Sequence, residues 1–314
     1  MSYVHPLLLS YRLERRASKY RPTNSAKRLH IDLSNVEECD ALGMSIFLAN
    51  LAKEVRKHPE FEFQISYPNE KKLESRIREM QIEDLLHRLG LNANQTLDLW
   101  SRQIAPSREK PSFVVIDDNR EAILFLPKSS PEIGRSALNF ARRNLKRFYL
   151  ANSSDRIDYH QFHHVIDEII KNAVDHSNDV SITALRFEPE LGGTLRFVHC
   201  ELGDGIFTNV KRFLKKAKDE KLRKLGERDS ITECLHWAFL PGNTSKPHSG
   251  VNAGLGLSHI QAASHGGNIE VYFKDAQSMA YVSDFPNQYS HGQIRRRMYH
   301  VHPIPCFMYF GETR

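Results

Sequence analysis

The sequence predicts an α/β fold with the layers of an α+β sandwich, built from two units and a linker between them. In the first unit, residues 1–92, strand-like and helix-like segments alternate. In the second unit, residues 120–314, a helix with a polar face precedes a strand that ends in glycines, and a later glycine cluster opens another helix. Residues 92–112 are polar and contain two prolines, so we place a linker at residues 93–119.

The composition indicates a chain with packed cores and no membrane segment. Hydrophobic residues make up 40% of the 314 residues, and no apolar run approaches the roughly 20 residues that cross a bilayer. The first residues show no basic segment before their short apolar run and no small-residue cleavage site, so we expect no signal peptide. Four scattered cysteines without a CxxC pair favour reduced thiols over a disulfide framework or a zinc site. We therefore expect a cytoplasmic protein without a membrane partner.

The formal net charge of +6 is concentrated in three clusters of Lys and Arg, at residues 211–224, 142–147 and 295–297. Runs of charge are most often solvated faces. No aromatic residues alternate with these clusters as a surface for single-stranded nucleic acid would require. We therefore do not expect a nucleic-acid partner, although the charge does not exclude one.

The first unit shows a strand–helix–strand–helix pattern. Residues 29–33 and 61–65 predict strands, because apolar residues gather or alternate there between polar flanks. A helix is predicted at residues 41–57 with Asp40 as its N-cap. A second amphipathic helix is predicted at residues 71–89.

The segment IDLSNVEECDALGMSIFLANLAKEVRK resembles a STAS domain, the fold of anti-sigma-factor antagonists. The family pattern is a strand ending in Asp-Leu-Ser, followed by an Asp-Ser-Ser-Gly-like turn that opens a helix. This chain has Asp40-Ala41-Leu42-Gly43 at the turn, and Leu42 stands where regulated members carry the phosphorylated serine. The resemblance therefore implies an interaction domain that is not phosphorylated at this turn. An unrelated small α/β unit is the alternative.

The remaining elements of the second unit are inferred from apolar runs and chain breakers. Helices are expected at residues 131–149, 208–225 and 231–239, and strands at residues 123–126, 195–198, 269–273 and 306–310. The helix at 208–225 is strongly basic and ends at Gly226.

Residues 160–177, HQFHHVIDEIIKNAVDHS, predict the helix around which the second unit is organised. Its apolar residues recur at spacings of three and four, which is typical of one buried stripe. Glu168, Asn172, Asp175 and His176 follow the same spacing and line a neighbouring face. A carboxylate, an amide and an imidazole beside a core stripe indicate a chemical role. A helix cap is the alternative role of His176.

Two glycine-rich stretches follow this helix, ELGDGI at residues 201–206 and GVNAGLGLSHI at residues 250–260. Glycines let backbone amides converge on phosphate oxygens. A helix N-terminus adds unsatisfied N–H groups and a favourable dipole. Gly254-Leu255-Gly256 precedes a predicted helix and fits this description, and Lys246 in the preceding loop offers a charge to a terminal phosphate.

A nucleoside triphosphate site also needs a metal ligand, a base and a group that reads the nucleobase. Asn172 offers a neutral oxygen, which suits Mg²⁺ that phosphates already hold. Glu168, one helical turn earlier, is a candidate general base. Glu201, at the end of a predicted strand, is placed to accept a hydrogen bond from the exocyclic amine of adenine.

Together these stretches resemble the GHKL superfamily, also called the Bergerat or histidine-kinase-like ATPase fold, over about residues 120–312. EIIKNAVDHS matches the N box, ELGDGI the first glycine box, and PGNTSKPHSGVNAGLGLSHI the lid end and second glycine box. The resemblance implies a mixed sheet covered by helices on one face, with ATP and Mg²⁺ as ligands. The region 206–249 corresponds to a mobile lid in this superfamily.

The same resemblance assigns roles to individual residues. Asn172 would bind magnesium and Glu168 would be the catalytic base. Further nucleotide-binding positions are His176, Glu201, Gly203, Gly205, Lys246, Gly250, Gly254, Leu255 and Gly256. Glu201 departs from the family pattern, which has Asp there, and keeps the charge on a longer side chain.

The function that the resemblance implies is an ATP-binding, magnesium-dependent regulatory protein of the ATPase or protein kinase type. The γ-phosphate of ATP would go to water or to a partner protein that the STAS-like unit or the lid recruits. The resemblance is also compatible with a homodimer. The departure at Glu201 leaves open a non-catalytic, nucleotide-sensing interaction module. The basic stretch 208–225 leaves open a nucleic-acid-stimulated ATPase, which we consider the weakest of the three.

Overall fold

The computed structural model places most of both expected units. It describes residues 28–34, 36, 38–55, 62–89, 110–128, 131–152, 159–176, 179–188, 194–203, 205–228, 231–243, 257–258, 260, 270–275, 278–281 and 306–311. The statements below concern this part of the chain.

A seven-stranded sheet forms the centre of the structure, in the order β3-β4-β5-β6-β9-β7-β8. The strands are β3 (Ser112–Ile116), β4 (Glu121–Leu126), β5 (Ser181–Glu188), β6 (Thr194–Glu201), β7 (Glu270–Asp275), β8 (Ser278–Tyr281) and β9 (Cys306–Gly311). Every neighbouring pair is antiparallel. The expected mixed sheet is therefore wrong for the described strands. Short connections such as the turn 117–120 reverse the chain, and a reversal produces antiparallel neighbours.

The two faces of the sheet carry two separate cores, because successive side chains of a strand point to opposite faces. On β4, Ile123 and Phe125 belong to one core, whereas Ala122, Leu124 and Leu126 belong to the other. All five side chains are buried. A continuous apolar run is therefore what a strand covered on both faces requires.

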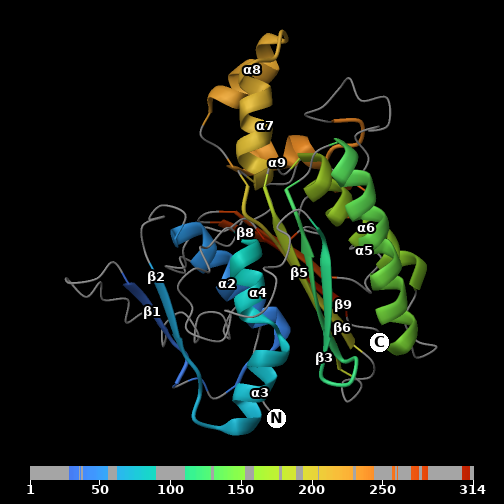
Figure 1. The fold of residues 1–314 in the computed structure, drawn as a ribbon. Helices are drawn as coiled ribbons and strands as arrows, with labels where there is room; N and C mark the ends of the chain where they lie inside the picture. Colours follow the sequence, from blue (N-terminus) through green and yellow to red (C-terminus); the bar gives the residue numbers. More distant parts are fainter. Residues whose placement is uncertain are drawn as a thin grey trace.

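Helices α5 (Pro131–Asn152) and α6 (Tyr159–His176) cover one face of the sheet (Figure 1). This agrees with the expectation that the helices of the second unit lie on one face. The opposite face is also covered, since α2 (Ala41–Val55) packs against β5 and β6 and shares a core with them. The sheet therefore lies between two helical layers.

The first unit has the expected order of strands and helices. Strands β1 (Arg28–Asp32) and β2 (Glu62–Ser66) pair in parallel, with α2 between them in the chain. The predicted cap of α2 is confirmed, because the N–H of Gly43 donates to Oδ1 of Asp40 at 2.6 Å.

The single helix expected at residues 71–89 is wrong, because two shorter helices occupy this stretch. They are α3 (Lys71–Glu79) and α4 (Ile82–Arg88). Gln81 between them has φ 52°, in the left-handed region, which interrupts the helical backbone.

The first unit and the sheet do not have separate cores. Leu42, Phe47 and Leu86 lie in the same buried cluster as Ile182 and Val198 of the sheet. The end of the expected linker also belongs to the sheet, since residues 112–116 form β3 and pair with β4. A hydrophobic strand after Pro111 was hidden by the polar residues before it. Whether the two units are STAS-like and ATPase-like stays a prediction.

The expected basic helix at 208–225 is wrong as one element, because two helices form there. They are α7 (Gly205–Lys215) and α8 (Glu220–Glu227). The break occurs because Asp219 caps a new helix, with Oδ1 accepting from the N–H groups of Lys221 at 2.8 Å and Leu222 at 3.1 Å. Both helices stand beyond one end of the sheet, next to α9 (Ile231–Phe239) (Figure 1).

The late strand expected at residues 306–310 is confirmed as β9, which lies between β6 and β7. Three cysteines with described side chains, Cys39, Cys200 and Cys234, are buried, and none of the three forms a disulfide. Within the described residues, no helix combines the length and apolar character needed to span a bilayer.

Candidate functional site

Helix α6 has the buried stripe that its sequence predicts. Val165, Ile166 and Ile169 are at most 2% exposed and face the sheet within the core of α5 and α6. Glu168 and Asn172 are partly exposed and lie one turn apart on the edge of this stripe. The helix therefore carries a carboxylate and an amide at the margin of the core.

The side-chain amide of Asn172 is the first unusual feature of the site. Its Nδ2 atom is buried and has no hydrogen-bond partner among the described residues. An unsatisfied buried amide costs about 1–3 kcal/mol, so such groups are uncommon in native proteins and require an explanation. A ligand that completes its hydrogen bonds would remove this cost.

Strand β6 brings a second acidic group to the same face of the sheet. Leu195, Phe197, His199 and Glu201 alternate along β6, and the first two pack in the core beneath α5 and α6. Glu201 is 5% exposed. The strand alternation therefore places its carboxylate on the sheet face that α6 covers.

The first glycine box follows Glu201 directly. The N–H of Leu202 donates to the carbonyl of Val180 at 3.1 Å, so the strand stays paired up to this residue. The chain then bends at Gly203, and α7 begins at Gly205. The expected strand end, glycine turn and following helix are all present, with the helix starting three residues earlier than predicted.

A buried polar trio stands where the sequence analysis named only Glu201. His199 is fully buried, and its Nδ1 lies 2.8 Å from Oγ1 of Thr183 on β5. Its Nε2 lies 3.7 Å from Oε1 of Glu201 and has no hydrogen-bond partner among the described residues. The imidazole ring stacks on Phe197 at 6.4 Å. In the sequence, the signal for this trio is His199 itself, a polar residue in an apolar strand two positions before Glu201.

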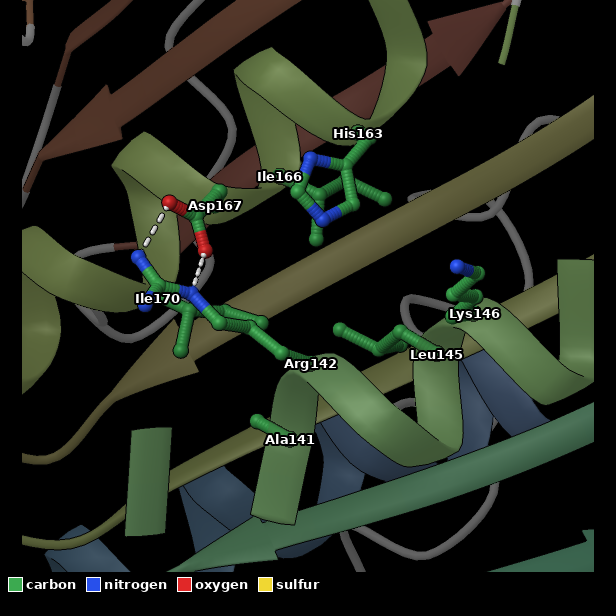
Figure 2. A pocket seen from close by; sticks show the side chains of 8 residues that line it. All are labelled: Ala141, Arg142, Leu145, Lys146, His163, Ile166, Asp167 and Ile170. Atoms are coloured by element: carbon green, nitrogen blue, oxygen red, sulfur yellow. Dashed lines mark hydrogen bonds and ion pairs between the residues drawn. The ribbon is translucent and has the colours of Figure 1, made fainter. Parts of the chain in front are cut away.

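Helices α5 and α6 are joined by a charged pair at the rim of a small pocket (Figure 2). Arg142 donates from Nε and Nη2 to the two carboxylate oxygens of Asp167, the second at 2.7 Å. The hydrogen bond to Asp167 raises the pKa of Arg142 above its usual value, and burial acts against this.

The pocket between α5 and α6 is distinct from the candidate site. Its α6 lining comes from His163, Ile166, Asp167 and Ile170. Since each residue turns a helix by about 100°, Glu168 and Asn172 point to the opposite flank of α6. The pocket is therefore not the place where these two side chains meet a ligand.

The glycines of the second glycine box, Gly250, Gly254 and Gly256, lie outside the described residues, and so do Lys246, Leu255 and the side chain of His176. Part of the end of the box is described. Ile260 is buried in the core formed by α5, α6 and the sheet, and Leu257 packs against it. Leu257 also packs against the core of α7 and α9. The chain therefore returns to the α6 side of the sheet immediately after the glycine cluster.

The donor set defines which metal the site could hold. Among the described residues, no three His, Cys, Asp or Glu side chains come together as a metal site. Asn172 fits a magnesium ion whose remaining ligands are phosphate and water oxygens. It does not fit a cage made by protein side chains alone.

Comparison of the chain with family models, with curated proteins and with solved structures gives no match. No shared family therefore assigns roles to these residues. The features that bear on function are the placement of Asn172, His199 and Glu201 and the order of the sequence motifs.

Proposed function

We propose that the chain is an ATP-binding, magnesium-dependent regulatory protein of the GHKL type. It hydrolyses ATP or transfers the γ-phosphate to a protein. The observation that carries this proposal is the unsatisfied buried amide of Asn172, on the helix that covers the sheet face where Glu201 ends its strand. The N–H groups of such an amide suit a phosphate oxygen and its carbonyl oxygen suits Mg²⁺, whereas the buried carboxylate suits the amine of adenine.

In this proposal each described residue has one task. Glu201 accepts a hydrogen bond from the amine of adenine, and Asn172 supplies an oxygen to magnesium. Glu168 orients or deprotonates the attacking nucleophile. The glycines at 203 and 205, with the cluster at 254–256 and Lys246, approach the phosphates.

The N-terminal unit supplies contacts to other proteins in the proposed function. The turn at residues 40–43 is not available for such contacts, because Leu42 is fully buried and Asp40 is 5% exposed. A partner would therefore bind elsewhere on this unit. The burial of Leu42 also agrees with a turn that is not a phosphorylation site.

The first experiment measures ATP binding by calorimetry with and without magnesium. The wild-type protein should bind ATP more tightly with magnesium, and Asn172→Ala should lose this increment. Asn144→Ala is the matched control, since the amide of Asn144 on α5 already donates to the carbonyl of Phe140 at 2.9 Å. Equal magnesium dependence in Asn172→Ala and wild type would remove the assigned role of Asn172.

The second experiment follows the phosphate. Incubation with γ-labelled ATP, with and without candidate partner proteins, shows whether the label appears as free phosphate or on protein. Glu168→Gln should bind ATP as wild type does and abolish the label transfer.

A non-catalytic nucleotide-sensing module is the second candidate. It is favoured by the replacement of the usual Asp with Glu201 and by the buried His199 beside this carboxylate. ATP binding without turnover in the wild type would favour this module. Absence of any magnesium-dependent ATP binding would leave an interaction protein without a nucleotide.

A further inference from the structure

The hairpin of α7 and α8 carries the entire net charge of the protein. Residues 205–228 contain nine Lys or Arg and three Asp or Glu, a net charge of +6. The 314-residue chain also has a net charge of +6, so the other residues together are neutral. Such a concentration in 24 residues marks a surface of distinct electrostatic potential.

The hairpin is a packed unit. Val210 and Leu214 of α7 form a core with Cys234 and Ala238 of α9. A Cβ added at Gly226 would lie 2.5 Å from the backbone nitrogen of Lys215, so α7 and α8 meet backbone to backbone. The basic side chains are therefore mounted on helices with a fixed relative position.

The cationic side chains are on the outside of this unit. Lys215, Lys216, Lys218 and Lys221 are all exposed. The three acidic residues are already engaged: Asp219 caps α8, Glu220 pairs with Lys224 at 2.8 Å, and Glu227 lies 3.7 Å from Arg223. The acidic groups therefore offset charge locally along α8 and leave the tip of the hairpin strongly positive.

From this surface we infer a binding site for the phosphate backbone of nucleic acid. Six of its nine basic residues are Lys, a residue that protein–protein interfaces disfavour. The large exposed hydrophobic side chains among the described residues are Val115, Leu150 and Leu240, and none of them lies on α7 or α8. Affinity without apolar anchors is typical of phosphate contacts.

The same surface defines what kind of binding to expect. Among the side chains of α7 that the structure describes, the aromatic one is Phe213, which stacks on Trp237 at 5.7 Å and packs against the core, so it is not an exposed stacking platform for bases. Binding is therefore sequence-independent and driven by release of counterions. The described apolar side chains of α7 and α8 pack in or against the core shared with α9, so none of these is free to insert into a lipid surface.

The test measures binding of the full chain to a fluorescent random-sequence DNA duplex by anisotropy, without nucleotide, over a series of salt concentrations. The plot of log K against log salt should have a slope of roughly −4 to −5, corresponding to about five phosphates. The quadruple variant with Lys215, Lys216, Lys218 and Lys221 changed to Gln should weaken binding at least about tenfold at low salt. The variant should also make the slope shallower, with a magnitude smaller by about three. A second duplex of different sequence should bind equally.

The matched control removes three exposed positive charges from α5, by changing Arg143, Lys146 and Arg147 to Gln. This variant should bind the duplex within about twofold of wild type. Circular dichroism melts of both variants establish that each is folded. The inference is overturned if the wild type does not bind DNA or RNA, or if the quadruple variant binds like wild type. It is also overturned if only vesicles of phosphatidylcholine and phosphatidylserine are bound. The assay contains no ATP, so its outcome is independent of the proposed ATPase function.

Discussion

The buried carboxylate of Glu121 on β4 accepts a hydrogen bond from Nη2 of Arg76 on α3 at 2.6 Å. The other carboxylate oxygen accepts from the N–H of Ala41, the first residue of α2, at 2.9 Å. Arg186 on β5 completes the cluster by donating to Asp40 at 2.8 Å. Glu121 therefore joins the sheet to two helices of the N-terminal unit through groups that are far apart in the chain.

Loss of Arg76 should destabilise the protein strongly. In Arg76→Ala the carboxylate of Glu121, which is 1% exposed, loses its shortest charged contact. Removal of one partner of a buried pair costs about 3 kcal/mol or more. Because Glu121 keeps a contact with Arg186 at 3.6 Å, the loss of unfolding free energy should be close to about 3 kcal/mol. The free energy of unfolding in urea measures it.

Lys72→Ala is the control, because Lys72 is exposed on the same helix. It should change the free energy of unfolding by less than about 0.5 kcal/mol. Equal stability of the two variants would contradict the role of the Glu121–Arg76 contact.

The stability of the fold should depend on pH through Glu121. Burial, followed by the charge of Asp40, raises the pKa of Glu121 from 4.5 to about 7, against the opposing effect of Arg76 and Arg186. A raised pKa in the folded state means that the protonated form is favoured there. The contribution of Glu121 to stability is therefore full below pH 4.5 and is lost as the pH rises to about 7, by at most about 3 kcal/mol.

Glu121→Gln isolates this effect, because a neutral amide does not titrate. Between about pH 4.5 and pH 7, the unfolding free energy of the wild type should fall relative to that of Glu121→Gln. Above about pH 7 the difference between the two proteins should stay constant. Parallel stability curves for the two proteins over this range would show that Glu121 has an ordinary pKa in the fold.

The features that the sequence predicted correctly depend on residues that are close together in the chain. The cap by Asp40 and the buried stripe of α6 arise from spacings of three and four residues, which are visible in the chain. The shared core of α2 and the sheet depends instead on pairs such as Arg186 and Asp40, 146 positions apart. Local patterns carry no information on such contacts, so two separate units were expected.

The residues of the candidate site were proposed from motif order, and their roles stay a prediction. The structure places Glu168 and Asn172 on α6 and Glu201 on β6, on or beside one face of the sheet. His199 was not predicted because it lies before the first glycine box, although the strand alternation puts it on the same face as Glu201. The split of the basic segment was not predicted, although Asp219 is of a residue type that caps helices.

Gly226→Ala should destabilise the α7–α8 hairpin, although the same change usually stabilises a helix by about 1 kcal/mol. The new Cβ would lie 2.5 Å from the nitrogen of Lys215 and 2.8 Å from the carbonyl carbon of Leu214, and both are backbone atoms that cannot rotate away. Overpacking of this kind costs about 1–3 kcal/mol. Amide hydrogen exchange of α7 and α8 should therefore accelerate.

Gly242→Ala provides a comparison with a different cause. Gly242 has φ 84° and no atom within 4 Å of an added Cβ, so only backbone strain opposes the change. This variant should leave exchange in the hairpin unchanged. If Gly226→Ala slowed exchange in α7 and α8, the close approach of the two helices would be wrong.

Two adjacent carboxylates on α6 should give opposite results when each is changed to its amide. Asp167 holds Arg142 of α5 through both oxygens (Figure 2), so Asp167→Asn should lower the free energy of unfolding by about 1–2 kcal/mol. Glu168 lies on the other flank of the helix and acts on Arg142 only through its charge, so Glu168→Gln should lose no such pair of hydrogen bonds. Asp167→Asn should therefore keep ATP turnover at temperatures where it is folded, whereas Glu168→Gln should keep stability and ATP affinity but lose turnover. Urea unfolding and release of labelled phosphate, measured on both variants, separate the two roles. Loss of turnover in folded Asp167→Asn, with normal turnover in Glu168→Gln, would reverse the assignment of the base.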